Sequence, residues 1–244
     1  MNWKYKISNN ILYFCFLGFL LFVILFFLIF VNLSTFICGV NTVTDIDGNI
    51  YSTVKIGNQC WMTENMNVGK MIADPSIMPS DNYKIEKWCN GADGKAHTVS
   101  GDCDIYGGLY TWDEATNPYG NNSGDICPKG WHIPTDTEQY NLENYLTTDN
   151  CDATRSNVWD CSPAGKYMSY FTSDGTNSSG FSALLAGYIR TDRTFYNRGI
   201  FTSFWSSSTV GEDALSRFLY SDKEGIHRNR HSKSHGFSVR CLKN

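Results

Sequence analysis

The sequence predicts an α+β domain with an antiparallel sheet and one or two short helices, preceded by one N-terminal transmembrane helix. Three observations support this class. A long uncharged apolar run lies near the start of the chain, strand-like segments begin and end the remainder, and helix signals lie between them. Strands at both ends with helices in the middle indicate an α+β domain, whereas a parallel sheet would need strands and helices in alternation.

The apolar run, residues 11–31, is long enough to cross a bilayer core of about 30 Å as a helix. Two lysines precede it and no charged residue follows until Asp45, so the positive-inside rule places the N-terminus in the cytoplasm. We expect residues 1–40 to form a cytoplasmic stub and membrane anchor, and residues 42–244 to form one extracellular domain. The expected localisation is the cell membrane, with a single pass.

Two alternatives compete for this N-terminal segment. A cleaved signal peptide has an apolar stretch of about 7–15 residues and a small-residue cleavage site, whereas this run is longer and lacks an A-x-A sequence. A lipoprotein would carry its lipid on Cys38, but Phe36 and Ile37 are not the small residues expected before such a cysteine. We therefore favour the uncleaved anchor.

Cysteine usage agrees with export. Beyond Cys15 and Cys38 the chain has seven cysteines: Cys60, Cys89, Cys103, Cys127, Cys151, Cys161 and Cys241. None forms a CxxC pair, so the spacing of zinc ribbons and thioredoxin-like sites is missing. Scattered cysteines in an exported domain usually form disulfides, but an odd number leaves one over and spacing alone does not fix the connectivity.

The first element after the anchor is a hairpin. Residues 43–57, "VTDIDGNIYSTVKIG", alternate on both sides of the turn residues 47–49. The D-x-D-G start is shared with calcium loops, but an EF-hand needs Glu at its twelfth position, which here is Ile56. We interpret this segment as a turn.

Helices are expected in the middle of the chain. Residues 106–115 predict a short helix with one apolar side, formed by Leu109, Trp112 and Ala115. Thr135 and Glu138 form a capping box, and the apolar stripe after it predicts a helix of about three turns, with Leu142, Tyr145 and Leu146. Residues 149–180, rich in Asp, Asn, Ser, Thr and Gly, predict a long loop region that contains Cys151 and Cys161.

The last third of the chain predicts short strands. They are separated by turn signals such as "SDKEG" and read "GFSALLAGYIR", "GIFTSFWSSS", "ALSRFLY", "GIHRNR" and "GFSVRCL". Three histidines, His227, His231 and His235, lie four residues apart here. On a helix they would share a face and could hold a metal, but on a strand neighbours in this series lie about 13 Å apart. The strand interpretation holds, so we predict no metal site.

No constellation for catalysis is evident. Ser206–Ser208 lack the G-x-S-x-G pattern of a nucleophile elbow. His132 lies near Asp136 and Glu138, but acidic residues in a first helical turn cap the helix and stabilise its dipole. "YGGLY" lacks the spacing and the lysine of a phosphate loop. We predict no catalytic residue, no cofactor and no enzyme activity.

Charge is uneven along the extracellular part. Residues 41–216 hold 11 Lys and Arg against 22 Asp and Glu, and residues 217–244 hold 7 against 2. The basic end could meet an anionic partner, or it could pack beside the acidic body and offset it. We favour the second interpretation and expect no nucleic-acid partner.

Seven separated segments together resemble the Fibrobacter succinogenes major paralogous domain family. They occur in the family's order over nearly all of residues 43–244, and include "QCWMTENM", "CDIYGGLYTWDEA", "ICPKGWHIPTDTEQ", "NSSGFSALLAGYIR", "TFYNRG", "FWSSS" and "SKSHGFSVRCLKN". The resemblance implies an exported, anchored bacterial protein. It also implies a fold related to the C-type-lectin-like and formylglycine-generating-enzyme-like group, in which the last strand returns beside the first.

The same resemblance implies a disulfide pattern. It pairs Cys127 with Cys241, Cys89 with Cys103, and Cys151 with Cys161. Cys60 is left over, either as a free thiol or paired with Cys38. The calcium motifs of sugar-binding lectins, E-P-N or Q-P-D and W-N-D, are missing, and only Cys241 stands where sulfatase-activating enzymes need a cysteine pair. Neither activity carries over.

We therefore expect a non-enzymatic extracellular binding module of a bacterial surface, with a polysaccharide or a surface protein as ligand. Aromatic side chains dominate such contacts, and the candidates are Tyr188, Tyr196, Trp205 and Tyr220. Two alternatives remain. One is an enzyme on a formylglycine-generating-like scaffold, in which His132 or a free Cys60 would meet a carboxylate in a cleft. The other is a purely structural surface protein.

Overall fold

The computed structural model describes residues 14, 17–22, 35–79, 83–91, 101–117, 124–148 and 150–244. The chain forms two compact units, Met1–Ile37 and Cys38–Asn244. Most of the expected anchor, residues 11–31, lies outside the described residues; Phe14 and residues 17–22 are helical. Within the described ranges, no helix is long and apolar enough to cross a membrane.

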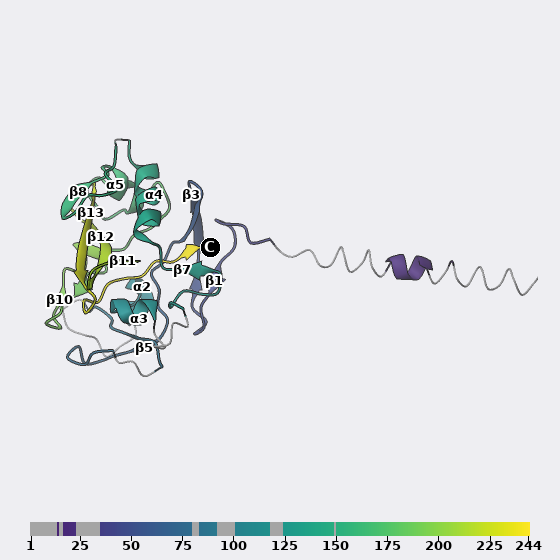
Figure 1. Ribbon diagram of the computed structural model, residues 1–244, viewed down its shortest axis with the longest axis horizontal. Coiled ribbons are helices and arrows are strands. Elements are labelled where there is room, and N and C mark those ends of the chain that lie inside the picture. The colour runs from purple at the N-terminus through teal and green to yellow at the C-terminus, as the bar shows by residue number, and fades with distance from the viewer. Residues whose placement is uncertain are drawn as a thin grey trace, which may run out of the picture. The chain divides into compact units, whose positions relative to one another are not determined.

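The second unit is an α+β domain with two four-stranded antiparallel sheets, as the order of strand and helix signals predicts (Figure 1). The first sheet has the order β11 (Phe201–Val210), β12 (Asp213–Tyr220), β13 (Ile226–Ser232) and β8 (Val158–Asp160). The second has the order β3 (Thr53–Ile56), β4 (Gln59–Met62), β14 (Leu242–Lys243) and β7 (Trp131–His132). Because β14 lies between β4 and β7, the C-terminal end of the chain lies beside the first strands of the domain.

Shorter elements complete the domain. Three pairs of two-residue strands are β1 (Val43–Thr44) with β2 (Ile50–Tyr51), β9 (Tyr188–Ile189) with β10 (Phe195–Tyr196), and the parallel pair β5 (Lys70–Met71) with β6 (Glu86–Lys87). The described helices of this unit are α2 (Gly101–Tyr106), α3 (Trp112–Thr116), α4 (Asp136–Leu146) and α5 (Ala164–Met168).

The first hairpin is confirmed, and its turn is organised by Asp45. The Asp45 carboxylate accepts hydrogen bonds from the main-chain N–H groups of Asp47 and Asn49, at 2.9 and 3.0 Å, and from the Tyr51 hydroxyl at 2.7 Å. An acidic side chain that accepts bonds from the main chain two and four residues ahead closes a turn. This carboxylate is therefore occupied by the turn.

Helix α4 begins where its capping box predicts. Thr135 accepts a hydrogen bond from the Glu138 main-chain N–H, and the Glu138 carboxylate accepts one from the N–H of Thr135. The expected helix at 106–115 begins later, because α3 starts at Trp112 and Leu109 instead bridges to Trp88. Gly107, with φ +75°, lies in the left-handed region and interrupts any helix across this segment.

Two expectations about the last 100 residues are wrong in detail. The expected loop region 149–180 contains β8 and α5, and the expected strand at 180–190 is regular only at β9. Gly187, with φ +70°, ends extended backbone before β9, and its Cα packs against Asn90 and the main chain of Tyr196. Strand β8 forms because it pairs with β13, and no local sequence pattern predicts this pairing.

The main core contains residues of α4, α5 and the inner face of the first sheet. Its largest members are Trp61, Leu142, Met168, Phe181, Phe204, Leu219 and Ile226. Among the described residues, four disulfides join Cys38 to Cys60, Cys89 to Cys103, Cys127 to Cys241, and Cys151 to Cys161. The last three are the pairs that the family resemblance implies, and Cys60 is not a free thiol.

Candidate functional site

The two faces of the first sheet differ in what they contact. On β12, Leu219 belongs to the main core and Arg217 pairs with Glu143 of α4, so these side chains point towards the helices. Successive side chains of a strand point to opposite faces. Phe218 and Tyr220 therefore point the other way, away from α4.

A row of aromatic rings lies on that second face. We define the aromatic face as Trp159, Tyr188, Tyr196, Phe218, Tyr220 and His227. Trp159 of β8 lies 5.1 Å from His227 and 6.3 Å from Tyr220, between ring centroids. Phe218 stacks on His227 at 5.5 Å with an angle of 5° between the ring planes. These spacings are those of favourable aromatic pairs.

The row continues to the hairpin β9–β10 through Phe201, which is buried beneath it. Phe201 lies 4.7 Å from Phe218 and 5.1 Å from Tyr188. Tyr188 then stacks on Tyr196 at 5.8 Å. The Arg190 guanidinium lies 5.0 Å over the Tyr196 ring and donates to the Tyr196 hydroxyl at 3.1 Å. An arginine stacked on tyrosine holds the ring in place.

Three of the four expected contact residues lie on the aromatic face, and the fourth does not. Tyr196 is 37% exposed, and Tyr188 and Tyr220 are half-buried. Trp205 is 0% exposed: its ring lies 4.2 Å from Phe237, and its indole N–H donates to the Tyr110 carbonyl at 2.8 Å. Trp205 is therefore a core residue, because the segment containing Phe237 covers it.

Sequence reasoning missed three members of the aromatic face. Trp159, 38% exposed, lies in the segment for which the sequence predicts a loop, but it pairs in register with His227. Phe218 and Tyr220 stand two residues apart on one predicted strand, and that spacing alone places them on one face. Phe218 was therefore detectable from the sequence, whereas Trp159 and His227 were not.

The histidines follow the strand interpretation only in part. His227 and His231 share one face of β13 and both contact Phe218, as a strand predicts. His231 and His235, however, have ring centroids 5.4 Å apart, because the chain turns after Ser232 and the strand spacing no longer applies. Burial, with its histidine neighbours adding to it, lowers the pKa of His231 to about 4. Burial also lowers the pKa values of His227 and His235.

The strands that carry the aromatic face all lie in the part of the chain that matches a protein-family model. The family model of the Fibrobacter succinogenes major domain matches residues 54–243. The chain belongs to this family. No curated protein and no solved structure matches it. The match spans β4 to β14 and therefore includes every residue of the aromatic face.

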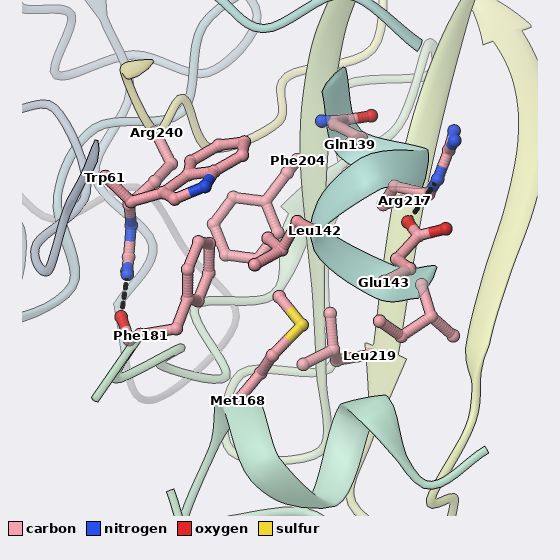
Figure 2. Close-up of a pocket in the computed structure, with 11 residues that line it drawn as sticks. Trp61, Gln139, Leu142, Glu143, Met168, Phe181, Phe204, Arg217, Leu219 and Arg240 are labelled. Carbon is pink, nitrogen blue, oxygen red and sulfur yellow. Dashed lines mark hydrogen bonds and ion pairs between the residues drawn. The ribbon is translucent and has the colours of Figure 1, made fainter. Parts of the chain in front are cut away.

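The Fibrobacter succinogenes major domain also encloses a small cavity between α4 and the first sheet, lined by core residues such as Trp61, Phe181 and Phe204 (Figure 2). Its volume of about 20 Å³ has room for about one water molecule and not for a ligand. Arg240, fully buried, also lines it; its guanidinium donates to Asn65 at 2.6 Å and lies 4.4 Å over Phe181. Burial lowers the pKa of Arg240 to about 9. The cavity belongs to the core.

A second recess of the domain, of about 440 Å³, is open and polar. It lies between the β3–β4 turn and α4, and is lined by Ile56, Gly57, Asn58, Gln59, Asn141, Asn144 and Tyr145. The Gln59 amide already donates to the Glu138 carbonyl at 2.9 Å. This groove offers amide groups and one exposed ring, and none of the described residues that line it is charged.

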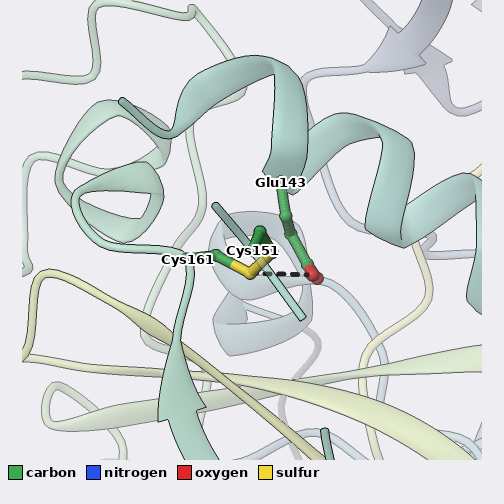
Figure 3. Close-up of side chains that lie close together, drawn as sticks. All are labelled: Glu143, Cys151 and Cys161. Atoms are coloured by element: carbon green, nitrogen blue, oxygen red, sulfur yellow. Dashed lines mark hydrogen bonds between the residues drawn. A yellow bond between two sulfur atoms is a disulfide. The ribbon is translucent and has the colours of Figure 1, made fainter. Parts of the chain in front are cut away.

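Glu143, Cys151 and Cys161 place possible metal-ligating atoms within 4.8 Å of one another (Figure 3). In this domain, however, the two sulfurs form a disulfide and are not thiolates. The Glu143 carboxylate pairs with Arg155 and Arg217, both at 2.5 Å. Its charge is already balanced, so we assign this cluster a structural role.

The expected meeting of His132 with a carboxylate does occur, at the start of α4. His132 Nε2 lies 3.0 Å from Glu138 Oε1. Burial raises the pKa of the Glu138 carboxyl, but hydrogen bonds from Thr135 and from His132 outweigh this effect, so the pKa is lowered overall. Since Glu138 completes the capping box of α4, the pair is explained by helix capping.

Proposed function

We propose that this protein is a membrane-anchored, non-enzymatic binding module of a bacterial surface, and that its aromatic face binds a polysaccharide. The observation that carries the proposal is the row of partly exposed rings from Trp159 to Tyr196. Sugars present apolar C–H faces and hydroxyl edges. Rings with a polar tip suit both, because the ring stacks and the hydroxyl or guanidinium hydrogen-bonds.

A row of rings suits a chain-like ligand better than a compact one. The rings lie on β8, β12, β13 and the β9–β10 hairpin, so successive units of a linear polymer would meet successive rings. The lowered pKa values of His227 and of its neighbour His231 keep these imidazoles neutral at pH 7, and the Arg190 guanidinium lies 3.9 Å from the Asp192 carboxylate, which offsets its charge. A neutral polysaccharide is therefore the ligand class that we propose.

We also propose that the domain is C-type-lectin-like. The return of β14 beside β4, and the Cys127–Cys241 disulfide that joins the start of the helical region to the last strand, support this fold group. Sugar binding would then be independent of calcium, since the calcium motifs of lectins are missing from the sequence. The binding surface would be the sheet and not a metal-binding loop.

The apolar run 11–31 and the disulfides support an anchored domain in an oxidising compartment. The Cys38–Cys60 disulfide uses the sulfur that a lipoprotein would need for its lipid, which supports the uncleaved anchor over lipidation. An enzyme is less well supported, because Cys60 is disulfide-bonded and His132 contacts a helix cap.

The test is binding to a polysaccharide and glycan array by the full chain extracted in detergent, with and without EDTA. Trp159→Ala and Tyr196→Ala should each weaken binding at least tenfold, since removing a strong aromatic contact costs about 2 kcal/mol. The matched control is Tyr170→Ala, whose ring is 67% exposed but makes no contact with the aromatic face that the structure describes.

Specific binding that survives EDTA and fails in the two variants would support the proposal. Binding that EDTA abolishes would overturn calcium independence. No binding to any glycan, or binding that Trp159→Ala and Tyr196→Ala leave unchanged, would refute the polysaccharide proposal and direct attention to protein partners.

A further inference from the structure

Lys87 is a buried lysine whose amine contacts an asparagine side chain. It lies on β6 and is 7% exposed. Its Nζ donates to the main-chain carbonyl of Asn67 and, at 2.7 Å, to the side-chain Oδ1 of the same residue. Since a C=O bond adds about 1.2 Å, Nζ lies within about 4 Å of the Asn67 amide carbon, Cγ.

Packing holds both partners in place. The Lys87 stem lies against Gly108, where an added Cβ would lie 2.8 Å from Lys87 Cδ. The main-chain N–H of Asn67 donates to the Tyr51 hydroxyl at 2.8 Å. Next to Lys87, the main chain of Trp88 exchanges hydrogen bonds with Leu109 in both directions. The amine is therefore held beside the amide.

One carboxylate contacts the leaving group of this amide. Asn67 Nδ2 donates to Asp104 Oδ1 at 3.4 Å. Two other carboxylates influence Lys87, but both already accept main-chain hydrogen bonds: Asp45 closes the hairpin turn, and Asp47 accepts the N–H of Gly69 at 2.6 Å. Asp104, which is exposed on α2, is therefore the group placed to carry a proton between amine and amide.

The amine is also easier to deprotonate than a free lysine. Burial lowers the pKa of Lys87 to about 8, although the carboxylates of Asp47, Asp45 and Asp104 raise it. At pH 7 about a tenth of the molecules then hold the neutral amine, which is the nucleophilic form. A free lysine, with a pKa near 10.4, would be neutral in well under one molecule in a thousand.

We propose that Lys87 and Asn67 join in an intramolecular isopeptide bond. Nζ attacks Cγ of Asn67 and a new N–C bond forms. Asp104 takes a proton from Nζ and delivers it to Nδ2, the Cγ–Nδ2 bond breaks, and ammonia leaves. One amide replaces another, so the reaction needs no oxidant, no reductant and no cofactor.

The bond would reinforce a region that has little regular structure. Residues 63–91 contain only the two-residue strands β5 and β6 within their described part. A bond from Asn67 to Lys87 would close this segment covalently, next to the Cys89–Cys103 disulfide. The proposal goes beyond the binding function and does not depend on it.

Mass spectrometry of the full chain, reduced and alkylated in detergent, tests the proposal. The wild-type chain should be lighter than its sequence by one ammonia molecule. Lys87→Arg keeps the charge but cannot form the bond, so it should have its full sequence mass. Lys70→Arg, at an exposed lysine on the neighbouring strand β5, is the matched control and should still be lighter than its sequence by one ammonia molecule.

Protease digestion then locates the bond. A branched peptide that joins Asn67 to Lys87 supports the proposal, and Asp104→Ala should reduce its yield. A succinimide at Asn90, which precedes Gly91, would also remove ammonia, but that loss would persist in Lys87→Arg. Separate linear peptides containing Asn67 and Lys87 in the wild-type digest would overturn the proposal, even if Lys87→Arg fails to fold.

Discussion

Replacing Glu143 by glutamine should destabilise the domain by about 3–5 kcal/mol, the usual cost of breaking a buried ion pair. Glu143 is 1% exposed and its carboxylate holds two guanidinium groups, with Oε2 2.5 Å from Arg155 and Oε1 2.5 Å from Arg217. Glutamine has nearly the same size, so no cavity forms. The cost is electrostatic, because two buried cations lose the charge between them.

The two arginines should not lose the same amount of electrostatic stabilisation in Glu143→Gln. Arg217 keeps a second carboxylate, Asp136, at 2.7 Å. In the described part of the chain, Glu143 is the carboxylate that Arg155 contacts, and Arg155 is 3% exposed. Most of the cost should therefore come from Arg155. The double variant Glu143→Gln with Arg155→Met removes the stranded cation and should recover at least half of the lost free energy.

Urea unfolding of the full chain in detergent, with its disulfides intact and followed by tryptophan fluorescence, measures these free energies. Glu212→Gln, at an exposed turn position, is the control and should change the free energy of unfolding by less than about 0.5 kcal/mol. A free energy of unfolding for Glu143→Gln within about 1 kcal/mol of wild type, or a double variant as unstable as the single one, would show that the buried ion pair does not set the stability here.

Two further predictions concern a disulfide and a histidine. Cys127 and Cys241 are 114 residues apart, so replacing both with serine should lower the free energy of unfolding by about 4–5 kcal/mol in the chain-entropy model. Replacing Cys89 and Cys103, which are 14 residues apart, should lower it by about 3 kcal/mol. Equal shifts in the urea midpoint for the two variants would contradict this dependence on separation. The pKa of His231 is about 4 in the folded protein and about 6.5 in the unfolded chain. Its contribution to the free energy of unfolding is therefore fully present above pH 6.5 and is lost as the pH falls towards 4, by about 3 kcal/mol at most. His231→Gln should flatten the unfolding free energy between pH 6.5 and 4, and parallel curves for variant and wild type would exclude this cause.

Local signals in the sequence determined several elements. The T-x-x-E pattern at Thr135 predicted the start of α4, because the residues that satisfy its first N–H groups lie within one turn of each other. Short strand-like segments between turn signals predicted β11, β12 and β13 for a similar reason, since the turn residues that end each strand lie next to it in the sequence. These patterns need only neighbouring residues, so they can be recognised without the fold.

Other features depend on residues that are distant in the chain. Trp159 joins the aromatic face only because β8 pairs with the edge of β13, across about 70 residues. Likewise, Lys87 meets Asn67, and Arg217 meets Glu143, because packing places separate segments together.

Local periodicity and local hydrogen bonds were therefore enough to predict the class of the domain, its three longest strands and the start of α4. The tertiary structure alone decided which rings share a surface, which charges are buried as pairs and which amine lies beside an amide. Side-chain contacts across the chain depend on sheet order and packing, and neither can be read from the spacing of adjacent residues.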